Sequence, residues 1–533
     1  MIVRSESPAV AIPDVSVPSF VLRHAQRLAE KPALIEGPTG RTMTYGQLAD
    51  AVRRTATALH RRGLRKGDVF AIYSHNVPEY AVAFNAIASL GAVVTTANPL
   101  YTAGELTKQL TDCRARFLVT APPFLDKARE AATAAGVEDV YVFGTADGAR
   151  PFSELLDAPP DPPAVAINPA EDVVVLPYSS GTTGLPKGVM LTHRNLVANL
   201  SQINGARDFD AFGERDRILA FLPFFHIYGM VVVLQLGLCN GATIVTMPRF
   251  DFEEFLATAQ QYRITNLPIV PPIVLALVKS PIVDKYDLSS VRIVFTGAAP
   301  LGRAQAQQLV ERLGCQIRQG YGMTEASPVT HISPTRDGVP ANVGSVGRVV
   351  PNSEVKIVDP ATGHPVGSRN TEGELYIRGP HIMKGYLNQP GETAGCIDPE
   401  GWYHTGDVGY VDDDDWFFIV DRTKELIKYK GLQVAPAELE ALLLTHPAIL
   451  DVAVVRRPDE EAGEVPKAFV VLKPDSQSKS TTAEMIMAWV AERVAPHKRI
   501  RQLEFIEQIP KSPSGKILRR LLVDGPRTSS VAG

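Results

Sequence analysis

The chain has 533 residues, of which 45% are hydrophobic, 21% charged and 7% aromatic. Single hydrophobic cores stop growing at about 250 to 300 residues, so this length predicts at least two domains. The composition excludes a disordered or fibrous protein. A formal net charge of -4 provides no overall basic field, so we expect no nucleic acid and no anionic membrane surface as a partner.

The chain ends, the one long apolar stretch and the cysteines indicate in which cellular compartment the protein is expected. Residues 1–7 contain no apolar segment, and the last five residues match no address signal. The long apolar stretch at 227–247 is interrupted by Gln235, Asn240 and three glycines, which favours a buried helix followed by a strand over a membrane span. The four cysteines are widely spaced and form no CxxC pair, which is typical of a reducing compartment, and we expect a cytoplasmic protein. They are Cys113, Cys239, Cys315 and Cys396.

Helical and strand patterns alternate in the first part of the chain. Between residues 32 and 119, amphipathic helical patterns are separated by short apolar runs at 69–73 and 92–95. This alternation predicts βαβ units around a mostly parallel sheet. The proline-rich residues 158–163 are expected to form a linker, since they suit neither a helix nor a central strand. Apolar runs at 173–176 and 293–295 predict further buried strands.

The pattern of apolar residues, glycines and prolines changes twice after this α/β region. Beyond residue 343, short β patterns at 354–358 and 374–379 are separated by Gly and Pro, which predicts a small β subdomain. Beyond Asp421 a new α/β unit begins. Pro436 suits the first turn of a helix, and apolar runs at 452–455 and 468–472 suit strands.

A segment rich in glycine and hydroxyl groups follows the predicted strand at 173–176. Its glycines let the backbone bend so that successive N–H groups point to one place, its hydroxyls add donors, and its lysine adds charge. This combination is typical of a polyphosphate site, although no GK[ST] sequence closes it as in a Walker A loop. The segment reads Tyr178-Ser179-Ser180-Gly181-Thr182-Thr183-Gly184-Leu185-Pro186-Lys187-Gly188.

Four later segments accompany this loop in chain order, and the whole set resembles the motifs of the adenylate-forming superfamily. That superfamily includes acyl-coenzyme A synthetases, beetle luciferases and the adenylation domains of peptide synthetases. The resemblance covers residues from about 20 to 522. The later segments are Gln319-Gly320-Tyr321-Gly322-Met323-Thr324-Glu325, Tyr403-His404-Thr405-Gly406-Asp407, Val420-Asp421-Arg422-Thr423-Lys424-Glu425-Leu426-Ile427-Lys428-Tyr429-Lys430-Gly431 and Pro513-Ser514-Gly515-Lys516.

Within the superfamily the chain is most similar to the branch of 4-coumarate:coenzyme A ligases and luciferases, through residues 223–228 and 428–433. The resemblance implies an α/β fold, with a large N-terminal domain of doubly wound α/β subdomains plus a small β subdomain, and a smaller mobile α/β C-terminal domain. It places the large adenylation domain at residues 1–421, a hinge at 422–424 with Lys424 as the pivot, and the mobile domain at 425–533.

The implied chemistry begins with ATP and Mg²⁺. A carboxylate must attack the α-phosphorus of ATP although both are anions, so the site needs cations and N–H donors. Thr183 and Glu325 are implied as the metal ligands, Asp407 as the ribose ligand and Tyr321 as the ring on which adenine stacks. The implied nucleotide and coenzyme A set is Ser179, Ser180, Gly181, Thr182, Thr183, Gly184, Lys187, Gly320, Tyr321, Gly322, Thr324, Asp407, Arg422, Lys428, Gly431, Gln433 and Lys516.

The resemblance also implies two steps that use the small domain differently. Lys516 is the catalytic lysine, which bridges the carboxylate and the α-phosphate when the acyl-adenylate forms. The domain then rotates, residues 428–433 face the site, and the thiol of coenzyme A attacks the acyl carbonyl. His226 is implied as the second catalytic residue, which orients the carboxylate, although a histidine in a Phe-rich run is equally compatible with a packed core.

The acid is the least determined part. The resemblance implies an aryl acid of the cinnamate or 4-coumarate type. Two positions depart from the plant ligases: Phe295 replaces a lysine and Val231 replaces an asparagine, so cinnamate or a medium-chain fatty acid gains weight over a hydroxylated ring. A long-chain fatty acid and the loading of a carrier protein remain alternatives, light emission is a distant third, and the oligomeric state stays open. The implied acid pocket is apolar with one aromatic wall and contains His226, Ile227, Tyr228, Val231, Pro268, Phe295, Gly297, Ala298, Gly320, Gly322, Pro328, Val329 and Thr330.

Overall fold

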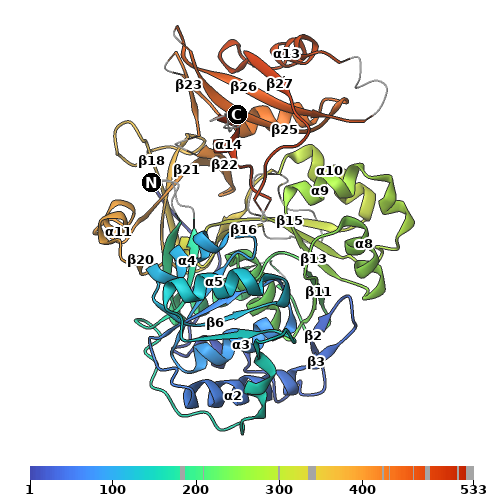
Figure 1. Cartoon of the computed structure of the whole chain (residues 1–533). Helices are drawn as coiled ribbons and strands as arrows, with labels where there is room; N and C mark the ends of the chain where they lie inside the picture. Colours follow the sequence, from blue (N-terminus) through green and yellow to red (C-terminus); the bar gives the residue numbers. More distant parts are fainter. Residues whose placement is uncertain are drawn as a thin grey trace, which may run out of the picture.

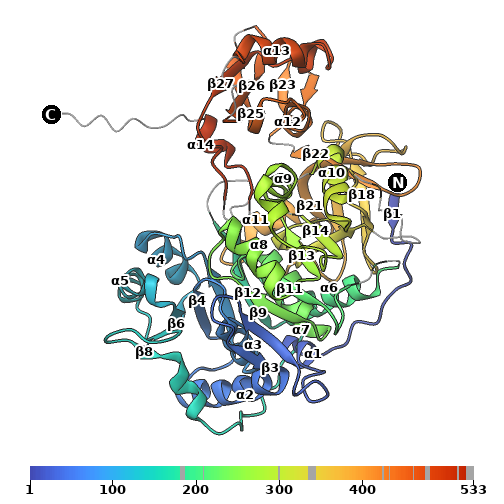
Figure 2. The same ribbon diagram turned by 90° about the vertical axis from the view of Figure 1, so that its right-hand side faces the viewer.

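The computed structural model describes residues 1–523 except 180–185, 208, 210, 298–300, 334–341, 343, 423–424, 431, 460, 475–480 and 513–514. Its described strands form four sheets, and the sheet formed by the C-terminal strands stands at one end of the molecule (Figures 1 and 2). Among the described residues, no helix is both long and apolar enough to cross a membrane.

The first large sheet has eight strands and is parallel from β9 to β8, as the alternating patterns predicted. Val69, Ala71 and Tyr73 of β4 pack under α4 and α5, whereas Phe70 and Ile72 face the other core with α2 and α3. Both faces are covered, which explains why β4 is apolar throughout. The sheet order is β20 (Gly385–Tyr386), β10 (Lys187–Thr192), β9 (Val173–Ser179), β5 (Val93–Ala97), β4 (Val69–Tyr73), β6 (Ala115–Thr120), β7 (Asp139–Val142) and β8 (Arg150–Pro151).

The second large sheet has nine strands and is parallel from β15 to β2, with antiparallel strands at both edges. One hydrophobic cluster joins it to the first sheet, so the two sheets form a single body. Its order is β17 (Arg348–Val349), β16 (Val329–Ile332), β15 (Gln316–Gly322), β14 (Ile293–Thr296), β13 (Asn266–Ile269), β11 (Arg217–Ala220), β12 (Thr243–Thr246), β2 (Pro32–Glu36) and β3 (Thr42–Thr44).

Helices cover the two large sheets, and the apolar stretch at 227–247 forms a buried helical segment followed by a strand, as predicted. That segment begins as a π-helix, η3 (Tyr228–Gln235). The α-helices are α1 (Val17–Val21), α2 (Tyr45–Arg61), α3 (Pro78–Ser89), α4 (Ala103–Asp112), α5 (Leu125–Ala135), α6 (His193–Gly205), α7 (Leu236–Cys239), α8 (Phe252–Gln261), α9 (Pro271–Lys279) and α10 (Arg303–Leu313).

The small β subdomain is confirmed as a five-stranded antiparallel sheet with its own apolar core. The N-terminal strand β1 pairs with β18 at its edge, which the sequence patterns did not predict. The helix α11 (Pro390–Cys396) lies between two of its strands in sequence. The order is β1 (Ile2–Arg4), β18 (Glu354–Val358), β19 (Gly373–Arg378), β21 (Tyr403–Val411) and β22 (Phe417–Arg422).

The C-terminal α/β unit has a separate sheet and a separate hydrophobic cluster. Pro436 lies in the first turn of α12, as expected from its fixed φ. The unit contains β23 (Ile427–Tyr429), β24 (Leu432–Val434), α12 (Pro436–Leu444), β25 (Ile449–Asp459), β26 (Gly463–Leu472), α13 (Ala483–Ala491), β27 (Gln502–Phe505) and α14 (Arg519–Val523).

A buried amide fastens α6 to β16. The Asn199 side chain donates to the Val329 carbonyl at 2.7 Å and accepts from the Val329 N–H at 3.1 Å, and Asn199 is fully buried. Replacing Asn199 with Ala should lower the free energy of unfolding by about 2 to 6 kcal/mol, because two buried backbone groups lose their partner at about 1 to 3 kcal/mol each. Urea denaturation measures the loss. The control is Asn204→Ala in the same helix, where the residue is exposed, and equal effects of the two substitutions would contradict the assignment.

Candidate functional site

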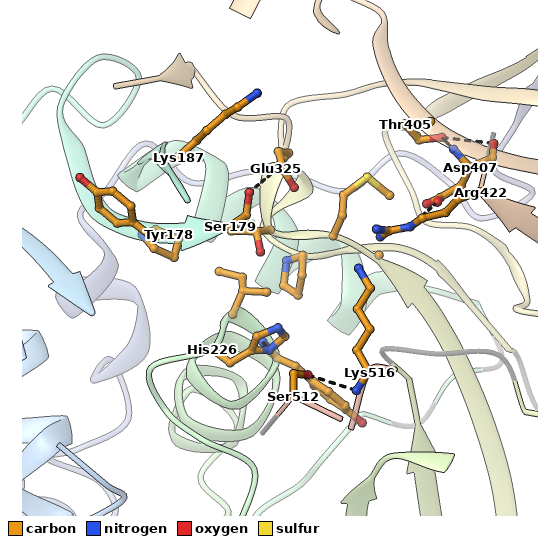
Figure 3. Close-up of a pocket in the computed structure, with 18 of the residues that line it drawn as sticks. Tyr178, Ser179, Lys187, His226, Glu325, Thr405, Asp407, Arg422, Ser512 and Lys516 are labelled. Atoms are coloured by element: carbon orange, nitrogen blue, oxygen red, sulfur yellow. Dashed lines mark hydrogen bonds and ion pairs between the residues drawn. The ribbon is translucent and has the colours of Figure 1, made fainter. Parts of the chain in front are cut away.

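A cavity of about 1250 Å³ lies where β9, β14 and β15 end. Ligands of open α/β sheets bind outside the carboxyl ends of parallel strands, and this cavity occupies that place. Strands β21 and β22 of the small sheet form another wall, and a loop of the C-terminal unit brings Lys516 into the cavity (Figure 3).

The glycine- and hydroxyl-rich segment connects β9 to β10 as an antiparallel hairpin in which Ser179 pairs with Lys187. This differs from a phosphate loop that enters a helix. The predicted ligands Ser180, Gly181, Thr182, Thr183 and Gly184 lie outside the described residues. At the base of the hairpin, the Ser179 hydroxyl donates to the Glu325 carboxylate at 2.8 Å.

Glu325 is the buried carboxylate of this part of the cavity. It lies in the short helix η5 (Thr324–Ala326), and it also accepts a hydrogen bond from the Tyr386 hydroxyl at 3.0 Å. Burial raises the pKa of Tyr386, and the negative charge of Glu325 raises it further, so this phenol stays a donor. Glu325 therefore keeps a fixed position with part of its lone-pair capacity free for a cation.

Lys187 is buried beside the same group, with its ammonium 5.0 Å from the centre of the Tyr386 ring and paired with the Glu392 carboxylate. Glu392 lies in α11 and lines the cavity. The sequence motifs gave no signal for Tyr386 or Glu392, because neither belongs to a motif and only the fold brings β20 and α11 to this wall.

Asp407 joins two elements of the small sheet to β15. Its carboxylate accepts a hydrogen bond from the Tyr321 hydroxyl at 2.6 Å and another from Arg422 Nε at 3.1 Å. Burial raises the pKa of Tyr321, and the neighbouring Asp407 charge raises it further. The three predicted nucleotide ligands Tyr321, Asp407 and Arg422 thus form one hydrogen-bonded group on the cavity wall.

Lys516 enters the cavity from the C-terminal unit, and its ammonium points into the space between the His226 ring and Arg422 (Figure 3). Burial lowers the pKa of Lys516 to about 8, and the Arg422 charge adds to the effect. Glu425, Asp407 and Glu325 act in the opposite direction. An anion that binds beside this lysine would favour its charged form and would form a favourable ion pair with it.

His226 faces Lys516 from the start of η3 (Figure 3). Burial lowers the pKa of His226 to about 4, with the Lys516 charge as the second cause, so the ring is neutral at pH 7. Its Nδ1 accepts from the Tyr228 N–H at 3.3 Å, which assigns the proton to Nε2. The ring can therefore donate one hydrogen bond into the cavity.

An apolar part of the cavity adjoins His226. The Tyr228 hydroxyl donates to the Phe295 carbonyl at 2.9 Å, and the two rings meet edge to face at 6.0 Å. Glycine at position 320 leaves room for the second ring, since a Cβ there would lie 2.8 Å from the Phe295 ring. The residues predicted for the acid pocket that line the cavity are His226, Ile227, Tyr228, Phe295, Gly297, Gly320, Gly322, Pro328 and Val329, and Thr324, predicted as a nucleotide ligand, also lines it.

Three residues predicted for the acid pocket do not line the cavity. Val232, rather than Val231, lines the cavity, and both residues lie in the π-helix η3. Pro268 lies within β13, beside β14. The Thr330 hydroxyl bonds to the Tyr321 carbonyl within the sheet instead. Ala298 lies outside the described residues.

The predicted coenzyme A segment lies away from this cavity. Residues 427–434 form the hairpin of β23 and β24, and the exposed Lys428 donates its N–H to Glu464 at 2.8 Å. Gly431 and the Gln433 side chain lie outside the described part of the chain. In this arrangement the cavity contains Lys516 and does not contain Lys428.

Comparisons with known proteins agree on the family. Residues 21–387 match the AMP-binding enzyme family, and residues 438–516 match the AMP-binding enzyme C-terminal domain. A 4-coumarate–CoA ligase of Petroselinum crispum is 46% identical over 98% of this chain and 96% of its own length. One from Oryza sativa subsp. japonica is 47% identical over 96% and 93%.

A solved structure gives the same result. The crystal structure of an anthranilate CoA ligase in complex with anthranoyl-AMP superimposes with a TM-score of 0.86 at 28% identity and covers 96% of each chain. The matches span nearly the whole chain and both of its parts. The chain therefore belongs to the AMP-binding, adenylate-forming enzyme family, as an ATP-dependent acid–thiol ligase.

Proposed function

We propose that the enzyme converts an aryl acid of the cinnamate or 4-coumarate type, ATP and coenzyme A into the acyl-CoA, AMP and diphosphate. The observation that carries this proposal is the convergence of Lys516, His226 and the Asp407 group on one cavity with an apolar, ring-lined end. The edge-to-face rings of Tyr228 and Phe295 suit a flat aromatic acid. The 4-coumarate–CoA ligases among its relatives support the same class.

The first step needs charge neutralisation. A carboxylate oxygen attacks the α-phosphorus, the bond to diphosphate breaks, and negative charge accumulates on the phosphoryl oxygens. Lys516 would stabilise that charge, while the Nε2–H of His226 would hold the carboxylate in line. Asp407 and Arg422 would bind the ribose, Tyr321 would stack on adenine, and Lys187 with the loop of 179–184 would bind the diphosphate.

Glu325 and Thr183 are the proposed protein ligands of Mg²⁺. Magnesium in nucleotide sites uses one or two carboxylates together with substrate phosphates and waters, and the buried Glu325 carboxylate fits that requirement. Among the described residues, no group of three or more acidic, histidine or cysteine side chains is placed to hold a metal ion, so the substrate phosphates would be needed to complete the coordination. The bound ion would neutralise charge on the departing diphosphate.

We propose that the second step uses a different position of the small domain, because Lys516 occupies the cavity here and Lys428 does not line it. Residues 425–533 would rotate on a hinge at 422–424 relative to the domain of 1–421. Lys428, Gly431 and Gln433 would then face the site. The thiol sulfur attacks the acyl carbonyl, AMP leaves, and the thiol proton passes to solvent or to the AMP phosphate.

Two other acceptor or acid classes compete with this proposal. The apolar surroundings of Phe295 and Val232 would also suit a medium- or long-chain fatty acid. A carrier protein could replace coenzyme A as the acceptor. The similarity of residues 428–433 to the coenzyme A ligases favours free coenzyme A instead.

We infer a reducing, cytoplasmic location from the free cysteines Cys113, Cys239, Cys315 and Cys396.

A panel of aryl and aliphatic acids assayed by HPLC with ATP and coenzyme A tests the overall reaction. We expect AMP and an aryl thioester as products, with kcat/KM for cinnamate at least about ten times that for octanoate. An adenylate without a thioester would favour a carrier protein, and a preference for octanoate would contradict the aryl assignment.

Phe295 should limit the length of the acid. Its ring separates the main cavity from a second cavity of about 20 Å³, which is lined by apolar groups such as Phe212 and Leu236. Phe295→Ala would join the two, and kcat/KM for acids with a bulky para substituent should rise about tenfold relative to cinnamate. The exposed Phe250→Ala is the control, and an unchanged ratio in the Phe295 variant would contradict the assignment.

The pH profile of adenylate formation should report Lys516. Because the folded-state pKa of Lys516 lies near 8, the ammonium is lost as pH rises through 8, and kcat/KM for acid-dependent ATP–diphosphate exchange should fall there. Lys516→Arg should keep its charge, so its lower rate should show no such fall. An identical fall in both proteins would assign the titration to another group.

Replacing His226 with Ala should slow adenylate formation. The loss of one positioned donor typically costs about 10²- to 10³-fold in kcat, and the diphosphate-exchange assay measures it. His364→Ala is the control, since His364 is exposed. A near-normal exchange rate in the His226 variant would show that the histidine is only a packing residue.

A further inference from the structure

The loop that carries Lys516 is a closed turn. The Ser512 N–H donates to the Lys516 carbonyl at 2.8 Å, and the Leu518 N–H donates to the Pro510 carbonyl at 2.9 Å. Gly515 has φ +79° and approaches Val270 of the large body so closely that a Cβ would lie 2.9 Å from its side chain. These contacts fix the shape of the loop, but none of them fixes its position on the C-terminal unit.

Ion pairs at both ends of the loop supply that position. Before Lys516, the Lys511 ammonium bonds to the Asp451 carboxylate at 2.6 Å, near the start of β25. After Lys516, the Arg519 guanidinium is more extensively bound. Only two residues separate it from Lys516, and its side chain is 17% exposed. The outgoing end of the loop is therefore held by the half-buried Arg519, together with the packing of Ile517, Leu522 and Val523 against β25 and β26.

Every nitrogen of the Arg519 guanidinium has a partner. Nε donates to the Val454 carbonyl at 3.2 Å, and Nη2 donates to both oxygens of Glu440 at 2.8 Å. Nη1 donates to Glu425, the first described residue after 423–424. Glu440 in turn accepts from the Val454 N–H at 2.7 Å. Arg519 thus connects the loop to β25, to α12 and to the chain just beyond the proposed hinge.

We infer that Arg519 is a positioning residue for Lys516, which couples the loop to the hinge so that both move as one body. The inference rests on the proposed first-step role of Lys516. Arg519 lines the cavity, but each of its three nitrogens bonds to this chain, and Glu425 and Glu440 already balance its charge, so it is a poor ligand for substrate anions. Its contribution is geometric, and a displacement of about 1 Å at a reacting group can cost about 10²-fold in rate.

The two half-reactions separate this role from general support of the fold. Arg519→Met keeps the length of the stem and removes the guanidinium. In the full-length protein we expect acid-dependent ATP–diphosphate exchange to fall about 10- to 100-fold, because Lys516 loses its position. Thioester formation from a synthetic acyl-adenylate and coenzyme A should stay within about threefold, since that step does not use Lys516.

A double-mutant cycle shows whether Arg519 acts through Lys516. In a Lys516→Met background, Arg519→Met should reduce exchange by no more than about twofold. Arg493→Met is the matched control, because Arg493 also lies in the C-terminal unit, with an exposed guanidinium over Trp489. Both half-reactions of that control should remain within about twofold of the unmodified protein.

The outcomes are distinguishable. Equal losses in both half-reactions, no loss in either, or additive losses in the cycle would overturn the inference. A Lys516→Met protein with normal exchange would instead overturn the proposed role of Lys516. If Arg519→Met does not fold, as judged by circular dichroism, Glu440→Gln weakens the same ion pair with little change of shape. It should show the same selective loss, about 3- to 10-fold, and an unselective loss would refute the positioning role.

Discussion

The ammonium of Lys516 enters a cavity whose walls belong mostly to another part of the chain, and the proposed first step depends on that contact. Burial lowers the pKa of this lysine to about 8, while the carboxylates of Glu425, Asp407 and Glu325 favour its charged form. An anion that binds beside Lys516 would therefore raise the pKa of this lysine and stabilise its charged form. The cavity, the small sheet and the loop of the C-terminal unit must therefore be placed together.

The apolar and the charged parts of the cavity lie on different elements. The ends of β14 and β15 and the start of η3 supply the wall proposed to bind the acid, where hydrogen bonds such as that from Tyr228 to the Phe295 carbonyl fix the rings. The charged groups lie on other elements: Asp407 and Arg422 on β21 and β22, and Lys516 in the C-terminal unit. This division suits a reaction in which the acid stays in place while the charged groups around it change.

Several parts of the site could be predicted from short stretches of sequence. Glu325, Asp407, Arg422 and Lys516 lie in motifs, and all four line the cavity. Other predicted positions are placed differently, for reasons of longer-range geometry. Val231 was predicted to face the acid, but Val232 of the same π-helix lines the cavity, and the Thr330 hydroxyl bonds within its own sheet. Tyr386 and Glu392 carried no motif, because their importance arises only from contact with Glu325 and Lys187.

The sequence by itself determined the family, the α/β class, the small β subdomain and most of the groups that bear charge. The residues of one motif lie within a few positions of one another in the chain, and the chemistry of the site determines their types. They can therefore be identified without knowledge of the fold. Only the tertiary structure decided which apolar residues surround the acid and what holds Lys516. Those answers depend on side chains such as Arg519, Glu425 and Glu440, whose pairing requires α12, β25 and the hinge region to meet in space.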